Sequence, residues 1–120
     1  MGNKFSTKVN NEQILKETSE YPVVMYTKPN CGYCKMAKQL LDQEKILFKE
    51  NDLDLIAATN PEAYQPYING LVYTTRQTTV PQIFVCGRFI GGYTELYNLR
   101  EAKKLFESLD ECAYQYDPLI

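Results

Sequence analysis

Two cysteines separated by two residues, Cys31 and Cys34, are the residues of this chain best suited to chemistry. They follow the apolar run 23–26 and open a segment with helical spacing, 35–47. Unpaired backbone N–H groups at a helix N-terminus stabilise an anion, and such settings lower the pKa of a cysteine from about 8.5 to roughly 3.5–7.5. Because the thiolate is the nucleophilic form of sulfur, the pair predicts reversible thiol–disulfide exchange, with Cys31 as the more accessible sulfur.

A structural zinc site is the main alternative for such a pair, and the rest of the sequence argues against it. Tetrahedral zinc needs a second short-spaced cysteine pair or histidines. The chain has no histidine, and its other cysteines, Cys86 and Cys112, are isolated and far apart in the sequence. The absence of histidine also removes the usual base for a cysteine nucleophile. Activation is therefore expected from the helix end, a nearby cation and backbone donors.

Length and composition indicate one globular domain. The chain has 120 residues, of which 44% are hydrophobic and 23% charged, and its net charge is −2. This balance predicts no nucleic-acid partner, because nucleic-acid binding requires a basic surface. No apolar stretch approaches the ~20 residues that span a bilayer, and the first residues lack the apolar core of a secretory signal. We therefore expect a cytoplasmic protein whose four cysteines are reduced or redox-active rather than a structural framework.

The first six residues, Met-Gly-Asn-Lys-Phe-Ser, match the pattern for N-myristoylation with Gly2 as the acceptor. One myristoyl chain binds membranes only marginally. Two lysines, Lys4 and Lys8, would add only weak attraction to an anionic membrane surface. Gly2 is also a common second residue, so an unmodified Gly2 stays open as the alternative. Lipidation would give weak membrane association.

The hydrophobic pattern predicts the elements that position the cysteines. Asn10 caps a first helix with Ile14 and Leu15 facing inward, and residues 23–26 form a buried central strand. The next helix spans 35–47. Its apolar face is expected to consist of Met36, Ala37, Leu40, Leu41 and Leu47. Residues 48–53 are a weaker strand candidate.

The second half of the chain predicts a helix, a hairpin and a final helix. The helix begins at Asn60-Pro61 and is expected to end near Gly70, and residues 71–78 receive no assignment. Strands at 82–85 and 88–90 meet at Cys86-Gly87, a two-residue connection that suits a tight hairpin. The last helix places four apolar residues on one side: Leu96, Leu99, Phe106 and Leu109.

This order of elements predicts an α/β fold of the thioredoxin-like kind, a central four-stranded mixed sheet flanked by helices. Residues 10–110 are expected to form the domain. Residues 1–9 are expected to be a flexible N-terminal segment, and residues 111–120 a C-terminal tail.

Three motifs in this order resemble a dithiol glutaredoxin over about residues 10 to 110. They are residues 26–34 (Tyr-Thr-Lys-Pro-Asn-Cys-Gly-Tyr-Cys), 79–81 (Thr-Val-Pro) and 91–95 (Gly-Gly-Tyr-Thr-Glu). The resemblance implies a glutathione-dependent oxidoreductase that reduces protein–glutathione mixed disulfides and protein disulfides. Cys31 would take up glutathione as a mixed disulfide, which a second glutathione releases. For protein disulfides, Cys34 would resolve the intermediate and form the Cys31–Cys34 redox disulfide.

The resemblance also implies which residues bind glutathione. Lys28 would lower the pKa of Cys31 and attract the glycine-end carboxylate. Gln77 fits the same task better than Arg76. The Val80–Pro81 bond is cis in similar proteins and would present the valine backbone to the cysteine part of glutathione. The implied binding set comprises Lys28, Cys31, Tyr33, Gln77, Thr79, Val80, Pro81, Gly92, Tyr93 and Thr94, the last two offering N–H groups to the γ-glutamyl carboxylate.

Some positions depart from the family pattern. Gly32 stands where many relatives have proline, and Glu95 replaces the usual aspartate, so a contact to the γ-glutamyl amine would come from a longer arm. We expect no redox role for Cys86. Its thiol is either exposed and open to glutathionylation or half-buried and inert, and the role of Cys112 is equally open.

A different class of function also fits Gly32. Some glutaredoxins with glycine or serine after the first cysteine bridge a [2Fe–2S] cluster between two protomers, with Cys31 of each and two glutathiones as ligands. The chain would then be a dimeric carrier or sensor, whereas the catalytic hypothesis predicts a monomer without metal. A thioredoxin fed by thioredoxin reductase is a third alternative.

Overall fold

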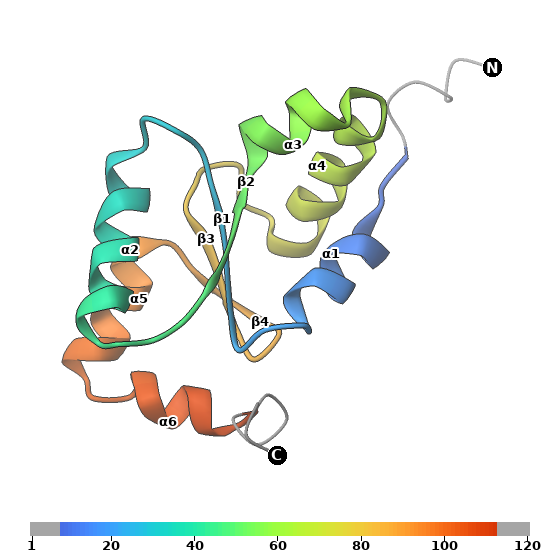
Figure 1. The fold of residues 1–120 in the computed structure, drawn as a ribbon. Helices are drawn as coiled ribbons and strands as arrows, with labels where there is room; N and C mark the ends of the chain where they lie inside the picture. The colour runs from blue at the N-terminus through green and yellow to red at the C-terminus, as the bar shows by residue number, and fades with distance from the viewer. Residues whose placement is uncertain (1–7, 113–120) are drawn as a thin grey trace.

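The structure, a computed structural model, describes residues 8–112 and has helices on both sides of one sheet (Figure 1). Its helices are α1 (Asn11–Thr18), α2 (Gly32–Gln43), α3 (Leu53–Thr59), α4 (Pro61–Thr75), α5 (Tyr93–Glu101) and α6 (Leu105–Asp110). Its strands are β1 (Val23–Thr27), β2 (Lys49–Asp52), β3 (Gln82–Val85) and β4 (Arg88–Gly91). The predicted candidate for lipidation, Gly2, lies outside the described residues.

The four strands lie in the order β2-β1-β3-β4. β1 pairs in parallel with β2 and antiparallel with β3, and β3 pairs antiparallel with β4. The predicted four-stranded mixed sheet is therefore confirmed. The β3–β4 hairpin matters most for function, because segments 79–81 and 91–94 lie at its open end.

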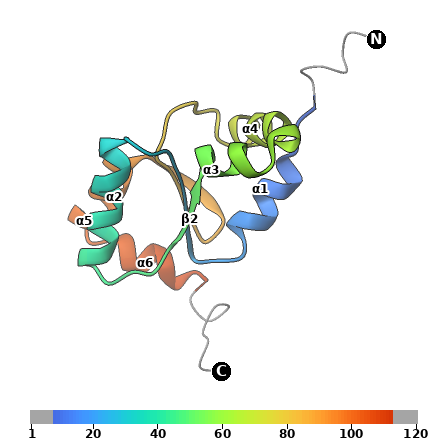
Figure 2. The ribbon, with the colours of Figure 1, turned by 45° about the horizontal axis from the view of Figure 1, so that its top comes forward.

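Alternate residues of β1 enter two separate hydrophobic cores, which is why residues 23–26 are all hydrophobic. Val23 and Met25 pack against α2, α5 and α6, whereas Val24 and Tyr26 pack against α1, α3 and α4. Figure 2 shows these two groups of helices on opposite sides of the sheet. All five residues of β1 are buried, so the strand that leads to Cys31 is a rigid support.

Several predicted helix boundaries are wrong. The second helix ends at Gln43, and Leu47 lies beyond it with 90% of its surface exposed. Leu15, also expected to face inward, is exposed, because the core side of α1 is marked by Ile14. The predicted last helix is two helices, α5 and α6, separated at Lys103, whose φ of 61° is incompatible with a continuous helix.

Gly70 does not end a helix as predicted, because α4 continues through it to Thr75. A β-carbon at Gly70 would collide with the backbone of Asn10 at the start of α1. The N–H of Asn10 also donates to the carbonyl of Pro66, 2.9 Å away, inside α4. Glycine is therefore required for the close approach of α1 and α4 rather than for a helix end.

A half-buried carboxylate joins α1 to the sheet and to α4. Glu17 Oε1 accepts hydrogen bonds from the hydroxyls of Tyr26, at 2.8 Å, and Tyr67, at 2.6 Å. Burial is the main cause that raises the pKa of both tyrosines, and Glu17 raises it further. Both hydroxyls therefore stay protonated as donors throughout the physiological range.

The two remaining cysteines are not isolated in space. Cys86, in the β3–β4 turn, and Cys112, after α6, are bonded to each other, with their Cα atoms 5.6 Å apart. Neither alternative for Cys86, an exposed thiol or a half-buried inert thiol, describes the structure, because α6 returns the chain to the hairpin turn and the half-buried Cys86 sulfur is bonded to Cys112. None of the described helices is long and apolar enough to cross a bilayer.

Candidate active site

Cys31 occupies the N-cap position of α2, immediately after the loop that follows β1. Its sulfur accepts a hydrogen bond from the backbone N–H of Cys34 at 3.1 Å, and the first turn contains no acidic residue. The N–H of Cys34 therefore points at this sulfur without a competing acidic side chain in the first turn, an arrangement that stabilises a thiolate.

Cys31 and Cys34 are bonded to each other, with Cα atoms 5.2 Å apart. Cys31 is half-buried, whereas Cys34 is 1% exposed and faces the core. An external disulfide can therefore reach the first sulfur more readily than the second. This difference in access fits a nucleophile and a resolving cysteine.

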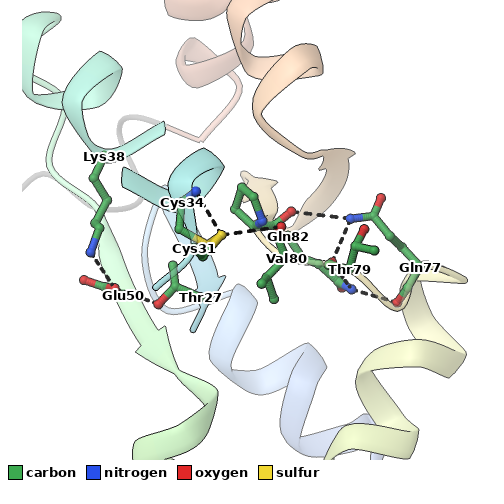
Figure 3. The surroundings of a disulfide bond; sticks show 10 residues. Thr27, Cys31, Cys34, Lys38, Glu50, Gln77, Thr79, Val80 and Gln82 are labelled. Carbon is green, nitrogen blue, oxygen red and sulfur yellow. Dashed lines mark hydrogen bonds and ion pairs between the residues drawn. A yellow bond between two sulfur atoms is a disulfide. The ribbon is translucent and has the colours of Figure 1, made fainter. Parts of the chain in front are cut away.

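The Val80–Pro81 peptide bond is cis, as the resemblance implies. The carbonyl oxygen of Val80 lies 3.7 Å from Cys31 Sγ, so this loop borders the sulfur directly (Figure 3). A groove begins here, between the loop and the start of α5. Its lining residues are Tyr33, Gln77, Thr79, Val80, Pro81, Gly92, Tyr93, Thr94 and Glu95.

The groove brings together the implied binding set except for Cys31, which contacts Val80 beside it, and Lys28. Lys28 is exposed in the loop before Cys31 and is not among the lining residues. Arg76, the weaker candidate for the glycine-end carboxylate, lies over the ring of Tyr73, 5.1 Å from its centroid, and is also outside the lining.

A network of side-chain amides holds the loop at 79–81 in place. Gln77 Nε2 donates to the carbonyl of Thr79 at 3.0 Å and to that of Pro81 at 3.4 Å. Gln82 Nε2 donates to the carbonyls of Gln77, at 2.7 Å, and Thr79, at 3.1 Å, as Figure 3 shows. Gln77 therefore braces the loop as well as lining the groove.

Gln82 was not singled out by the sequence reasoning, although a signal was present. It is a polar residue at the start of the apolar strand β3, and it is 2% exposed. Buried amides are retained where they satisfy backbone groups that would otherwise lack partners. Its position directly after Pro81 could have indicated that the partners lie in the loop.

Two glycines allow α5 to begin against the loop. Gly91 has a φ of +121°, in the region that favours glycine, and a β-carbon on Gly92 would lie 3.3 Å from the carbonyl oxygen of Pro81. Glu95 Oε1 accepts the N–H of Gly92 at 2.7 Å. This carboxylate oxygen thus caps α5, so the longer arm proposed for a substrate amine folds back onto the backbone.

Neighbouring tyrosine rings extend from the groove along α5, with Tyr33 and Tyr93 stacked and Tyr93 and Tyr97 tilted. The ring centroids of Tyr33 and Tyr93 are 6.1 Å apart, and those of Tyr93 and Tyr97 are 6.0 Å apart. Tyr33 is 62% exposed, so one face of the stack is open to solvent beside Cys31. The four-residue spacing of Tyr93 and Tyr97 was the available signal for a stripe on one helix face.

On its opposite flank the site is tied to β2. Glu50 Oε2 accepts hydrogen bonds from Thr27 Oγ1, at 2.6 Å, and from Lys38 Nζ, at 3.0 Å (Figure 3). Thr27 is the last residue of β1 and Lys38 belongs to α2. The strand before Cys31 and the helix after it are therefore fixed to each other by one carboxylate.

The chain is similar to known proteins of one family. The glutaredoxin family model matches residues 23–90. Human mitochondrial glutaredoxin-2 is 36% identical over 100 residues, covering 83% of this chain, which spans only 58% of that protein. Glutaredoxin-C1 of Arabidopsis thaliana is 34% identical over 92% of this chain and 91% of its own length.

The similarity extends to solved structures. A buckwheat glutaredoxin–glutathione complex is 28% identical, covers 86% of this chain and 89% of its own, and superposes with a TM-score of 0.74. Together with the mixed sheet and the Cys31–Cys34 pair, these likenesses confirm the thioredoxin-like fold and the predicted family. The chain belongs to the glutaredoxin family.

Proposed function

We propose that this chain catalyses glutathione-dependent thiol–disulfide exchange and reduces protein–glutathione mixed disulfides and protein disulfides. The observation that carries this proposal is the position of the Cys31 sulfur. It lies at the N-terminus of α2, accepts the N–H of Cys34 at 3.1 Å and is 3.7 Å from the carbonyl of Val80, which lines the groove. An activated sulfur beside a groove of backbone donors and acceptors suits a peptide thiol.

The chemistry of glutathione matches the groove. The backbone of Val80 can pair with the cysteine part of the tripeptide, like an added rung of a sheet. Tyr93 and Thr94 are the first residues of α5, so their N–H groups have no partner within the helix and can receive the γ-glutamyl carboxylate. The buckwheat glutaredoxin–glutathione complex supports glutathione as the co-substrate.

In the proposed reaction the Cys31 thiolate attacks the glutathione sulfur of a glutathionylated protein. The protein–glutathione S–S bond breaks, the protein thiolate leaves and takes a proton from water, and Cys31 carries the glutathione. A second glutathione thiolate then attacks the bound glutathione sulfur, which releases glutathione disulfide and restores the Cys31 thiolate.

With a protein disulfide, the Cys31 thiolate attacks one sulfur, forms a mixed disulfide with the substrate and releases the first substrate thiolate. Cys34 then loses its proton and attacks Cys31, which expels the second substrate thiolate and forms the Cys31–Cys34 disulfide. Two glutathiones reduce this disulfide and leave as glutathione disulfide.

Serine variants of the two cysteines test this division of roles. In an assay coupled to glutathione reductase and NADPH, Cys31→Ser should abolish turnover of a glutathionylated peptide and of a protein disulfide. Cys34→Ser should retain the first reaction and lose the second. Cys86→Asn is the matched control, because it removes a cysteine remote from the groove, and both activities should persist. Equal loss of deglutathionylation in both serine variants would refute the proposal.

We propose that the positive charge of Lys28 stabilises the Cys31 thiolate and attracts the glycine-end carboxylate of glutathione. Its replacement, Lys28→Gln, should raise the pKa of Cys31, measured by thiolate absorbance against pH, and raise KM for glutathione. Lys16→Gln removes an exposed lysine from α1, on the other face of the sheet, and should change neither quantity. The same titration curve for Lys28→Gln and the unmodified protein would exclude an electrostatic role for Lys28.

The [2Fe–2S] hypothesis is a second candidate, favoured by the space around Gly32. A β-carbon there would meet nothing within 4 Å, so the position next to Cys31 lies against open space in this chain. The described residues contain no group of three or more potential metal-binding side chains, so a cluster would need two chains and two glutathiones. Reconstitution with iron, sulfide and glutathione should then give visible absorbance and a dimer by size-exclusion chromatography. A colourless monomer would exclude the cluster.

The cellular location of the protein is inferred from its sequence. We favour the cytoplasm, with weak membrane association if Gly2 is myristoylated, although the human relative is named as mitochondrial. The intact mass of the protein from its native cell tests the lipid directly, and an unmodified N-terminal residue would remove the membrane hypothesis.

A further inference from the structure

We propose that the Cys86–Cys112 disulfide is non-catalytic, that it locks the β3–β4 turn to the end of α6, and that it persists while the catalytic pair is reduced. The two residues are 26 positions apart in sequence, yet their Cα atoms lie 5.6 Å apart, within the range that disulfides require. This is a separate redox site whose oxidant is a small disulfide such as glutathione disulfide.

The strand register places this pair at the opposite end of the sheet from Cys31. Val23 at the start of β1 pairs with Val85 at the end of β3, and Tyr26 near the end of β1 pairs with Gln82. Cys31 comes after the end of β1 that holds Tyr26. Cys86 comes directly after Val85, at the other end of the sheet. Three residues of strand span about 10 Å, so Cys86 cannot attack a mixed disulfide on Cys31.

The surroundings of the two pairs differ in electrostatics. The Cys86 sulfur lies 3.5 Å and 3.6 Å from the carbonyl oxygens of Ser108 and Leu109, in the last turn of α6. The Cys112 sulfur lies 3.8 Å from the carbonyl of Leu109, and its side chain is 4% exposed. Carbonyl oxygens and burial disfavour a thiolate at the second pair, whereas Cys31, which also lies 3.7 Å from the carbonyl of Val80, receives the N–H of Cys34 at 3.1 Å. Exchange at the second pair is therefore slow, and external thiolates reach it poorly.

The hairpin turn gives an independent reason to regard Cys86 as a bonding residue. Its φ is +52° and that of Gly87 is +80°, a pair of positive values that turns of this type usually fill with asparagine or aspartate followed by glycine. Cysteine has no advantage in this backbone conformation. Its partner Cys112 supplies the reason for its presence.

The same two segments are also joined without a covalent bond. Arg88, two residues after Cys86, forms an ion pair with Glu111, the neighbour of Cys112. Leu105 of α6 is buried in the core that contains Leu96 of α5. The cysteines therefore lie together before they are oxidised, and the disulfide closes a contact that already exists.

Formation of the bond is balanced by the glutathione couple. The half-buried Cys86 loses its proton and attacks glutathione disulfide, which forms a Cys86–glutathione mixed disulfide and releases one glutathione thiolate. Cys112 then loses its proton and attacks the Cys86 sulfur, which releases the second glutathione thiolate. The two thiolates take up the two protons, so one glutathione disulfide becomes two glutathiones.

Chemical trapping compares the two pairs in the unmodified protein. The chain is equilibrated with graded ratios of glutathione to glutathione disulfide, quenched in acid, denatured, alkylated and mapped by peptide mass. We expect ratios at which Cys31 and Cys34 are alkylated while the Cys86 and Cys112 peptides stay joined. Alkylation of both pairs at the same ratio, or of Cys86 and Cys112 even in excess glutathione disulfide, would overturn the proposal.

Thermal unfolding tests the effect of the cross-link on the fold. In a Cys31→Ser/Cys34→Ser background, dithiothreitol should lower the midpoint by on the order of 10 °C, because only the second disulfide can be reduced. Adding Cys86→Asn, which suits the turn, or Cys112→Ala should give a protein whose midpoint no longer responds to dithiothreitol. An unchanged midpoint on reduction of the background protein, or the same shift after Cys86→Asn, would contradict the proposal. Neither measurement depends on turnover, so the result is independent of the proposed function.

Discussion

Replacement of Gln82 by methionine tests whether the buried amide sets the geometry of the groove. The change keeps the length of the side chain and suits a buried strand, but it removes two hydrogen bonds. These are the bonds to the carbonyls of Gln77, at 2.7 Å, and Thr79, at 3.1 Å. The loop at 79–81 then loses the side-chain hydrogen bonds that Gln82 of β3 donates to it and to Gln77.

The free-energy cost of this replacement depends on the hydrogen bonds that the two carbonyls keep. Two neutral hydrogen bonds contribute about 1–3 kcal/mol. The carbonyl of Gln77 still accepts from Thr75 Oγ1, and that of Thr79 still accepts from the Gln77 amide. Gln82 Oε1 is buried without a partner in the structure, so its removal offsets part of the loss. The expected cost to loop order is therefore about 1–2 kcal/mol, which corresponds to a 5- to 30-fold rise in KM for glutathione at about 1.4 kcal/mol per factor of ten.

The coupled assay with a glutathionylated peptide measures KM, and thermal unfolding reports any general loss of stability. Gln65→Met is the control, because it makes the same chemical change at an exposed position of α4 outside the groove. It should leave KM unchanged. If Gln82→Met lowers the melting temperature but leaves KM within two-fold, the amide stabilises the fold without organising the groove, and the reasoning is refuted.

Two further predictions concern the fold. Gly70→Ala should lower the free energy of unfolding in urea by about 1–3 kcal/mol, because the new β-carbon meets the backbone of Asn10. Gly32→Ala, with open space around it, should be neutral or stabilising, and equal effects at the two glycines would contradict this account. Burial raises the pKa of Tyr26 and Tyr67 above the ordinary value of 10.0, so the unfolded chain releases these protons first. The free energy of unfolding should fall above about pH 10, by up to about 2.7 kcal/mol per pH unit, and equal values at pH 9 and pH 11 would show that neither hydroxyl is held protonated.

Local signals predicted the parts of the fold that depend on near neighbours in sequence. The apolar run of β1, the hairpin around Cys86-Gly87 and the cap of α1 at Asn10 appear in the structure. The strand depends on the burial of its own side chains, the hairpin on the geometry of a two-residue turn, and the cap on a hydrogen bond between residues three positions apart. Helix ends were less predictable. A glycine that ends a helix and a glycine that allows close helix packing, such as Gly70, look the same in the sequence.

The chemistry of Cys31 was likewise readable from the chain. A cysteine directly before a helix receives the first N–H groups whatever the rest of the fold does, and the structure places its sulfur 3.1 Å from such a nitrogen. The order of motifs around it also predicted the family and the fold. The sequence therefore determined the reactive sulfur, the central strand and the class of sheet, because each follows from hydrogen bonding and burial within a few residues.

Only the tertiary structure decided which distant residues meet. The bond between Cys86 and Cys112 requires α6 to return to the hairpin turn, and the role of Gln82 requires the loop before β3 to fold back over that strand. The stack of Tyr33 on Tyr93 requires α2 and α5 to lie side by side. These contacts depend on how helices pack across the sheet, and that packing is a property of the whole core rather than of any local pattern.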